Sequence, residues 1–437
     1  MLLLIPADSQ SGLGSSMAAN AKTKAILAAG VIGGASGAYF LIASGISLAH
    51  FLSAPSLFTG QTVAIDGLTY RPISTVTAQL KRLSIEGANM SATEAVATFS
   101  AGQGGANARE AFGKLTAEKI MTPEIQFAVP GGSVVLRDLA ITHVQNGMAA
   151  QMRIGGGDLT LKGAGTDATF KIGALTLTDV DVGYVFGALK SGGGKGEMFR
   201  YHTLNWDGMK GEMTAPSPQG GEHAEIEVGE VQGVNTYEGS LPVRAGFAIG
   251  GVRFTPASGA LGSGLMSIGL ETLDVSATIK ASYDWSARRM TVDEASLTFA
   301  DLGAVSVKGH FGNLDKSMLA ADQETRAGVL AGMTMESATI RFTNSGIVDK
   351  ALELAAKLTG QPVEAVKAMA IAAAGKSLLG GKGRIEDGPV MAAFIKDPRS
   401  LTISLRPKAG TMPISFDKMN GQFRDMNRFE MEMHSND

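Results

Sequence analysis

The sequence contains no cysteine, which excludes disulfide bonds, thiolate nucleophiles and cysteine-ligated metals. Charged residues make up only 18% of the 437 residues, and the net charge is −3. There is therefore no basic excess that would attract nucleic acid, and we expect no nucleic-acid partner. Tryptophan occurs only twice, whereas methionine occurs 21 times. We interpret the methionines as core residues that take the place of leucine.

Motifs that carry known chemistry are also scarce. The six histidines form no close pair and no HExxH motif, and there is no GxSxG motif. Residues 370–377 match a permissive phosphate-loop pattern that ends in Gly375, Lys376 and Ser377. We interpret this match as a coincidence, because alanines of a predicted helix precede it where a phosphate loop requires a strand and a glycine-rich turn. We therefore expect no enzyme activity, catalytic residue, cofactor or metal.

The most informative segment that is present is an uncharged span over residues 25–49. As a helix it reaches about 37 Å, enough to cross a hydrocarbon core of about 30 Å. Because Lys22 and Lys24 precede it, the positive-inside rule predicts a cytoplasmic N-terminus over 1–24, a transmembrane anchor over 25–49 and an exported remainder. Without disulfides, a bacterial periplasm is the natural setting for that remainder. Two alternatives stay open: a signal cleaved after Ala49, and translation that begins at Met17.

A short strand signature recurs along the exported part: an apolar residue, two mostly polar ones, an apolar residue, any residue, and an apolar residue. Its flanks alternate with period two, which indicates β-strands. The three-residue step breaks that alternation, and a bulge or sharp twist at the polar pair would return the apolar side chains to one face. Repeated bulges predict a large curved antiparallel sheet. The candidate apolar groove or core residues are Leu80, Leu83, Ile85, Leu136, Leu139, Ile141, Leu177, Val180, Val182, Leu270, Leu273 and Val275.

The pattern predicts a mainly β protein with minor helix. A β-rich region over 56–344 is interrupted by one or two short helices within 92–120, and glycine runs such as Gly131–Gly132 and Gly155–Gly157 are interpreted as turns.

Residues 345–426 are predicted to hold a helix pair and a final strand that pack on the sheet. Ser345 would cap the first helix, Gly360 would end it and Pro362 would begin the second. A short third helix is expected over 390–395 and a strand over 401–407. The remaining residues, 427–437, are expected to form a frayed polar tail.

Two stretches carry a family resemblance: residues 283–315, which contain DLGAVSVKGHFGNLD, and residues 338–370, which contain IVDKALELAAKLTGQPVEAVK. They are similar to membrane-anchored periplasmic proteins of unknown function in Gram-negative bacteria, the YdgA-type family. More distantly, the layout resembles AsmA-like envelope proteins. That resemblance implies a β-sheet groove that shields lipid tails, and a role in envelope lipid transport or assembly.

These observations lead to one expectation and two alternatives. We expect a non-enzymatic protein of the bacterial inner membrane, crossing once, whose periplasmic sheet binds membrane lipid in an apolar groove. Other envelope proteins are possible further partners. The first alternative is an envelope scaffold with a fully packed sheet, and the second is an envelope hydrolase. An open apolar face would separate the expectation from the scaffold.

Overall fold

A computed structural model describes residues 61–73, 75–100, 112–163, 166–191, 199–215, 222–239, 241–256, 266, 269–319, 323–374, 387–411 and 428–437. The chain divides into one unit over 1–44 and a second over 45–437, and every described residue belongs to the second. The anchor predicted for residues 25–49 lies outside the described residues. In the described part of the chain, no helix is both long enough and apolar enough to span a bilayer.

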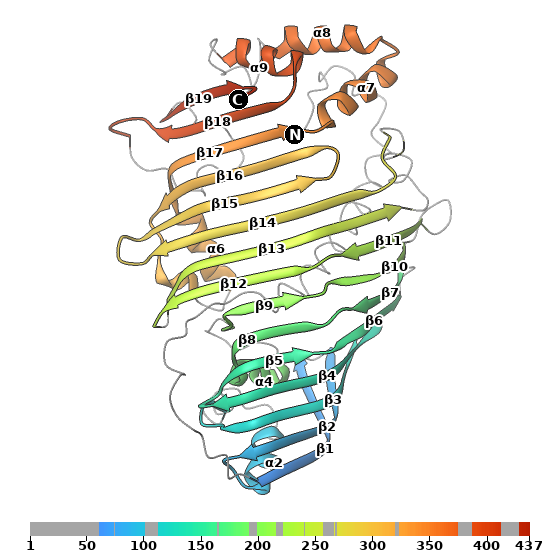
Figure 1. The fold of residues 1–437 in the computed structure, drawn as a ribbon, viewed down its shortest axis with the longest axis vertical. Coiled ribbons are helices and arrows are strands. Elements are labelled where there is room, and N and C mark those ends of the chain that lie inside the picture. The colour runs from blue at the N-terminus through green and yellow to red at the C-terminus, as the bar shows by residue number, and fades with distance from the viewer. Residues whose placement is uncertain are drawn as a thin grey trace. The chain divides into compact units, whose positions relative to one another are not determined.

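The second unit is built on one antiparallel sheet of 19 strands (Figure 1). The strands are β1 (Gln61–Ile73), β2 (Val76–Ala88), β3 (Ala117–Val129), β4 (Gly132–Gln145), β5 (Met148–Ile154), β6 (Gly156–Gly163), β7 (Thr166–Ile172), β8 (Leu175–Asp181), β9 (Thr203–Trp206), β10 (Met209–Ala215), β11 (Glu222–Val228), β12 (Val231–Glu238), β13 (Leu241–Pro256), β14 (Leu273–Asp284), β15 (Arg289–Phe299), β16 (Gly303–Gly312), β17 (Thr334–Asn344), β18 (Ser400–Pro407) and β19 (Phe429–Ser435).

Helices are short and fall between strands. They are α2 (Ala92–Ser100), α4 (Val182–Ser191), a 3-10 turn η2 (Lys316–Leu319), α6 (Gln323–Gly332), α7 (Ile347–Thr359), α8 (Val363–Ala374) and α9 (Asp387–Lys396). The prediction of a mainly β protein with minor helix and a large antiparallel sheet is confirmed.

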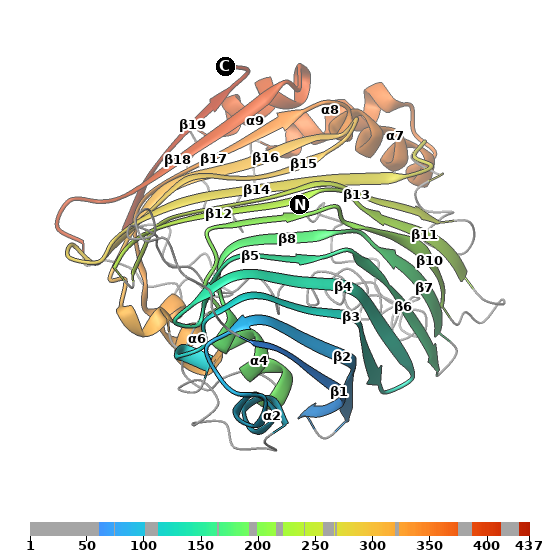
Figure 2. The ribbon, with the colours of Figure 1, turned by 60° about the horizontal axis from the view of Figure 1, so that its bottom comes forward.

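In the middle of the sheet, two short strands lie end to end and pair with different parts of the same long strand. β5 and β6 both pair with β4, and β12 and β11 both pair with β13. The chain passes from β5 to β6 through Gly155, whose N–H donates to the Arg137 carbonyl at 2.9 Å. The prediction that Gly155–Gly157 is a turn is therefore wrong: the chain continues along the same edge of β4 there. In Figure 2, β6, β7, β10 and β11 turn away from the direction of β5, β8 and β12.

The strand signature marks places where the backbone is kinked. In β4, Leu139 and Ile141 are buried and Leu136 is partly buried, whereas Arg137 and Asp138 between them are exposed. Asp138 has a φ of 56°, in the left-handed region that Asp tolerates better than most residues. The left-handed backbone at Asp138 interrupts the alternation of side chains by one residue, so that Leu136 and Leu139 face the same side of the sheet.

The same device recurs in other copies of the signature. Asp179 has a φ of 55° between Leu177 and Val180 of β8. In β15 the register shifts between Val292 and Ala295, across the polar pair of the signature. The predicted bulge or twist at the polar pair is thus observed in these strands.

The N-terminal third of the sheet is a packed core. Phe99, Phe112 and Phe186 are fully buried and pack with ring centroids 5.0 to 5.2 Å apart. Ser91 and Glu94 cap α2 reciprocally: the Ser91 N–H donates to Glu94 Oε2 at 2.8 Å, and the Glu94 N–H donates to Ser91 Oγ at 3.2 Å. The helix predicted at the start of 92–120 is therefore present, although 117–120 already belong to β3.

Helix α4 was not predicted. Asp181 Oδ1 accepts a hydrogen bond from the Tyr184 N–H at 2.9 Å and so caps the helix. Val182, which the strand signature placed in β8, is its first residue. Residue 182 is helical rather than part of the strand because the buried Asp181 carboxylate accepts a hydrogen bond from a backbone N–H in the first turn of α4. In a continuing strand that N–H would point to a neighbouring strand instead.

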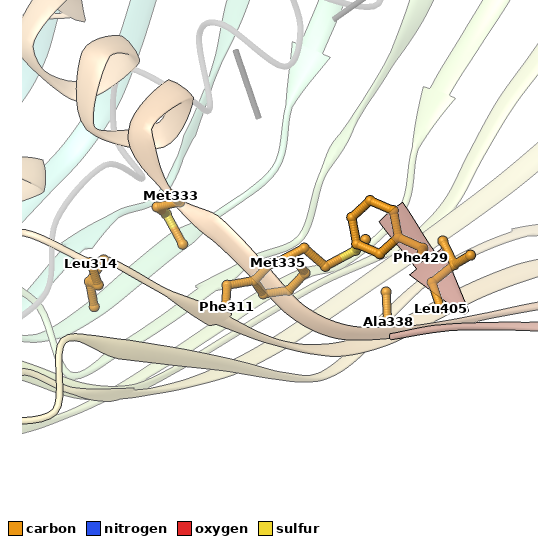
Figure 3. Close-up of a cluster of buried hydrophobic side chains, with 7 residues drawn as sticks. All are labelled: Phe311, Leu314, Met333, Met335, Ala338, Leu405 and Phe429. Carbon is orange, nitrogen blue, oxygen red and sulfur yellow. The ribbon is translucent and has the colours of Figure 1, made fainter. Parts of the chain in front are cut away.

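At the C-terminal end of the sheet, a second cluster packs around Met333, Phe311 and Phe429 (Figure 3). Phe429 belongs to β19, which pairs with β18 from Leu401 to Pro407. The prediction of a frayed polar tail over 427–437 is therefore wrong. Phe429, Met431 and Met433 alternate with polar residues, so the segment buries one apolar edge and remains ordered as a strand.

Helices α7, α8 and α9 lie between β17 and β18 in the sequence and pack beside these strands (Figures 1 and 2). Their shared core contains Leu352, Val366, Phe394 and Leu401. α7 ends at Gly360, whose φ of 65° is left-handed, and Pro362 precedes α8, as predicted.

The N-terminal cap of α7 differs from the prediction. Asn344 Oδ1, and not Ser345, accepts the hydrogen bond from the Val348 N–H at 3.0 Å. The N-cap position itself is Gly346, which has no side chain to offer.

A candidate apolar binding face

The two faces of the sheet differ in chemistry, because strand side chains alternate. Directly opposed residues share a face, so the register defines continuous rows. One row runs through Phe247, Ile279, Ala295, Val307 and Ile340, on β13 to β17. The neighbouring row on the same face runs through Ile249, Ala277, Leu297, Val305 and Phe342. We call the part of these two rows on β13 to β16 the open face.

Side chains of the open face are much less covered than those of the rest of this side of the sheet. Ile279 is 50% exposed and Leu297 is 39% exposed. Further toward β1, the same side of the sheet is closed: Leu177 is 0%, Leu204 2% and Val231 1% exposed. On this side of the described sheet, exposed large aliphatic side chains therefore lie on β14 and β15, at Ile279 and Leu297.

Packed clusters border the open face at two places. Toward one end of the strands, Tyr283 and Trp285 stack with ring centroids 5.7 Å apart and pack against the Phe311 cluster. Toward the other end, Phe342 meets Phe394 of α9 edge to face at 5.7 Å. These contacts hold the borders of the open face in fixed positions, so it is presented on a rigid sheet.

The opposite face of the same strands is polar and carries a cross-strand row of charges. Lys210, Glu227, Arg253 and Asp274 lie directly opposite one another on β10, β11, β13 and β14. Arg253 Nε donates to Asp274 Oδ2 at 2.9 Å, and its Nη1 donates to Glu227 Oε2 at 3.4 Å. The sheet thus presents charge to water on one side and aliphatic groups on the other.

Nearby charges and burial shift the pKa values of several side chains around the sheet. On the polar face, Lys171 and Arg137 donate hydrogen bonds to Asp158 and hold the pKa of this carboxyl below its usual range. At the border of the open face, burial raises the pKa of the Tyr283 phenol, so it stays neutral at physiological pH. The open face itself is lined by Phe247 and by aliphatic side chains including alanine, which supply apolar contact and no proton transfer.

The twelve candidate residues from the sequence separate into two groups. Those of the signature copies in β2, β4 and β8, together with Val182, are buried in the packed core, except for the half-buried Leu136. Leu270, Leu273 and Val275 are partly buried, and Val275 lies beside the open face, opposite Val252 and Phe299.

The residues at the centre of the open face were missed. Ile279, Leu297, Val305 and Val307 lie in strands whose alternation was recognised, and that alternation could have predicted which side they face. It could not have predicted their exposure, because exposure depends on which helices cover the sheet.

Other candidate chemistry receives no support. Among the described residues, no group of three or more His, Asp or Glu side chains is arranged to hold a metal ion. His202 Nδ1 lies 2.6 Å from the Asn235 carbonyl oxygen, a contact between neighbouring strand segments. Ala370–Ala374 end helix α8, as the interpretation of the phosphate-loop match requires, whereas Gly375, Lys376 and Ser377 lie outside the described residues.

A comparison with families of known proteins matches part of the chain. A family model described as "Uncharacterized protein" matches residues 296–428, which run from β15 to the residue before β19. No curated protein matches the chain. The matched region covers part of the open face and all of α7, α8 and α9.

Proposed function

We propose that this chain is a non-enzymatic protein of the bacterial inner membrane whose sheet binds lipid on the open face, for envelope lipid transport or homeostasis. The observation that carries the proposal is the exposure of Ile279 and Leu297 in the middle of an otherwise apolar, well-ordered sheet face. Fully burying an aliphatic side chain of this size contributes about 1.5–3 kcal/mol. Because Ile279 and Leu297 are only partly covered, a bound ligand that covers them would gain the remaining part of this free energy.

The kinked strands support the same proposal. Left-handed residues at Asp138 and Asp179 and the register shift in β15 bend individual strands. A bent sheet is concave on one side, and we propose that the open face lies on that side, where a ligand with an apolar tail would be sheltered from water. The proposed location rests on the uncharged span 25–49 and the lysines before it.

A lipid is favoured over a protein partner by the composition of the open face. Protein interfaces draw most of their affinity from buried Trp, Tyr and Arg side chains. Ile279, Leu297, Val305 and Val307 offer a surface without polar groups, which matches an acyl chain that has none. A scaffold with a fully packed sheet would have no reason to leave Ile279 half exposed.

Lipid co-purification tests the proposal. The chain from residue 56 to 437 is purified without detergent, extracted with organic solvent and analysed by mass spectrometry. We expect bound lipid in the wild type and a large loss of it in the double variant Ile279→Asn, Leu297→Asn. The matched control is Thr278→Asn, Ser296→Asn, which alters the same two strands on the polar face.

Three outcomes would contradict the proposal. A wild-type chain without lipid would support the packed scaffold. Equal lipid in both double variants would place the lipid elsewhere on the chain. Conversion of added lipid into hydrolysis products would support the envelope hydrolase.

A further inference from the structure

Tyr283 brings a phenolic hydroxyl to the border of the open face. Its partly buried ring packs against the Phe311 cluster and stacks on Trp285 with ring centroids 5.7 Å apart. Within the described part of the chain, the hydroxyl makes no hydrogen bond, and it is not sealed from solvent. A phenol packed into a hydrophobic cluster normally has a partner for its hydroxyl, so Tyr283 has room for one further hydrogen bond.

Two aromatic neighbours of Tyr283 have partners for their own polar groups. The Trp285 indole N–H donates to the Pro242 carbonyl oxygen at 2.6 Å. The Tyr237 hydroxyl, close enough for Tyr283 to raise its pKa, donates to the Tyr201 carbonyl oxygen at 3.3 Å. The protein thus supplies acceptors to both neighbours, which leaves a bound molecule as the partner for Tyr283.

A lipid that lies on the open face can reach this hydroxyl. Ile279, Ala281 and Tyr283 occupy every second position of β14, so their side chains stand on one side of the sheet. Ile279 and Tyr283 are about 14 Å apart along the strand. Ala281 is buried between them, and its methyl group extends less far from the sheet than either neighbour. An acyl chain that covers Ile279 can therefore extend past Ala281 to the phenol.

The surroundings of the hydroxyl favour an uncharged acceptor. Trp285, Met290 and Phe311 lie around the Tyr283 ring and carry no charge. A lipid phosphate or a free carboxylate would lose hydration beside them without gaining a cation. The carbonyl oxygen of an acyl ester is neutral, accepts a hydrogen bond and lies where the apolar chain of a lipid meets its polar head group.

We propose that the Tyr283 hydroxyl donates a hydrogen bond to the acyl-ester carbonyl of a lipid whose chain covers Ile279. This inference rests on the proposed lipid binding at the open face, and it names ester-linked acyl lipid as the class that binds there. Tyr283 then fixes the position of the ester, while the open face holds the chain.

Ester-linked and ether-linked lipids separate the carbonyl from the chain, because an ether lipid has the same chains and head group without the carbonyl. The full chain is purified in detergent, stripped of lipid and titrated with phosphatidylethanolamine of either linkage, and native mass spectrometry counts the bound lipid. We expect the wild type to bind the ester lipid about threefold to tenfold more tightly, the range that one net hydrogen bond supplies. Tyr283→Phe should bind both lipids as the wild type binds the ether lipid. Tyr237→Phe is the matched control and should keep the preference, because its hydroxyl already has a partner.

Stability without lipid gives a second readout. Removing a hydroxyl that has no partner costs little, so Tyr283→Phe should unfold at or above the temperature of the wild type. Tyr237→Phe should unfold at a lower temperature, because it leaves the Tyr201 carbonyl without its donor. A lower melting temperature for both variants would show that the Tyr283 hydroxyl has a partner within the protein, and would overturn the inference.

The lipid titration distinguishes this inference from the proposed function. If the wild type binds neither lipid, the proposed function fails and the inference fails with it. A wild type that binds ester and ether lipid equally well would overturn the inference alone. Equal weakening of both lipids by Tyr283→Phe would move the hydrogen bond to the head group, and would likewise overturn the assignment to the carbonyl.

Discussion

Arg253 and Asp274 lie directly opposite each other on β13 and β14, and the Arg253 Nε donates a hydrogen bond to Asp274 Oδ2 at 2.9 Å. This pair continues the charge row of the polar face through Glu227 to Lys210. Because both side chains keep contact with water, the pair contributes to the solubility and register of the sheet more than to its stability.

The first prediction concerns this pair. Asp274→Asn should lower the melting temperature slightly at low salt, and the difference should fade as salt rises, because screening shortens the reach of exposed charges from about 10 Å at 0.1 M to about 3 Å at 1 M. Thermal unfolding followed by circular dichroism measures it. Because Arg253 also pairs with Glu227, the double variant Arg253→Gln, Asp274→Asn should lose little more than Arg253→Gln alone. Fully additive losses would contradict direct pairing.

The second prediction concerns pH. Burial raises the pKa of Asp179, against a smaller opposing effect of His202. The folded state therefore holds this proton more tightly than the unfolded state, whose pKa is about 3.9. Stability contributed by Asp179 falls as pH rises through that range, so the full penalty is present at neutral pH.

Asp179→Asn should therefore raise the melting temperature at neutral pH and leave it unchanged at about pH 3, below the unfolded pKa. Asn tolerates the φ of 55° at this position. Asp138→Asn is the control, because Asp138 has nearly the same φ of 56° and is exposed. A gain for Asp179→Asn that is independent of pH would reject the explanation by burial.

The third prediction tests the kink in β4. Leu139→Asp places an unpaired charge at a side chain that is 4% exposed, so we expect it to cost more than about 4 kcal/mol or to prevent folding. Leu139→Ala should cost about 2–5 kcal/mol and remain measurable by urea unfolding. Arg137→Gln, two residues away and exposed, should have little effect. Similar losses at positions 137 and 139 would show that the two side chains do not face opposite sides.

A fourth prediction contrasts the packed and open parts of one apolar face. Ile141→Ala, at a fully buried position, should cost about 2–5 kcal/mol of unfolding free energy. Ile279→Ala, at a position that is 50% exposed, should cost less than about 1 kcal/mol. Urea unfolding of both variants gives the comparison. Equal costs would mean that Ile279 is covered in solution.

The fifth prediction concerns topology. Alkaline phosphatase fused after Asp437 should be active in a Gram-negative host, because residues 25–49 are proposed to cross the inner membrane and export the remainder. A fusion after Asn20 should be inactive. A stable but inactive C-terminal fusion would reject export, whereas a soluble mature chain that begins near His50 would reject only the anchor.

Much of the sheet could be predicted because each strand carries its alternating pattern in its own residues. Leu136, Leu139 and Ile141 break a period of two by one step, and only a kink returns all three to one side; Asp138 supplies it. The C-terminal end of helix α7 could likewise be predicted from the sequence, because Gly360 adopts the left-handed conformation that glycine favours.

Other features depend on partners that are distant in the sequence. β19 is a short alternation of Phe429, Met431 and Met433 with polar residues, and pairing with β18 places its apolar side chains on one partly buried side. α4 had a local signal in Asp181 followed by apolar residues at helical spacing, but the strand pattern before it ran through the same residues. The open face had no signal of its own, since Ile279 and the buried Ile141 have the same kind of sequence neighbours and differ in what lies above them.

The order of strand pairing has a consequence for how the chain reaches its structure. Most strands pair with the next strand in the sequence, as in the β1–β2 and β18–β19 pairs, whereas β5–β8, β7–β10, β9–β12 and β17–β18 pair across intervening elements. Contacts between sequence neighbours close small loops and form quickly. A chain that emerges N-terminus first can therefore add each new strand to an edge that earlier strands have formed, so assembly proceeds from β1 toward β19. β19 can join the sheet only after β18 has formed the edge with which it pairs.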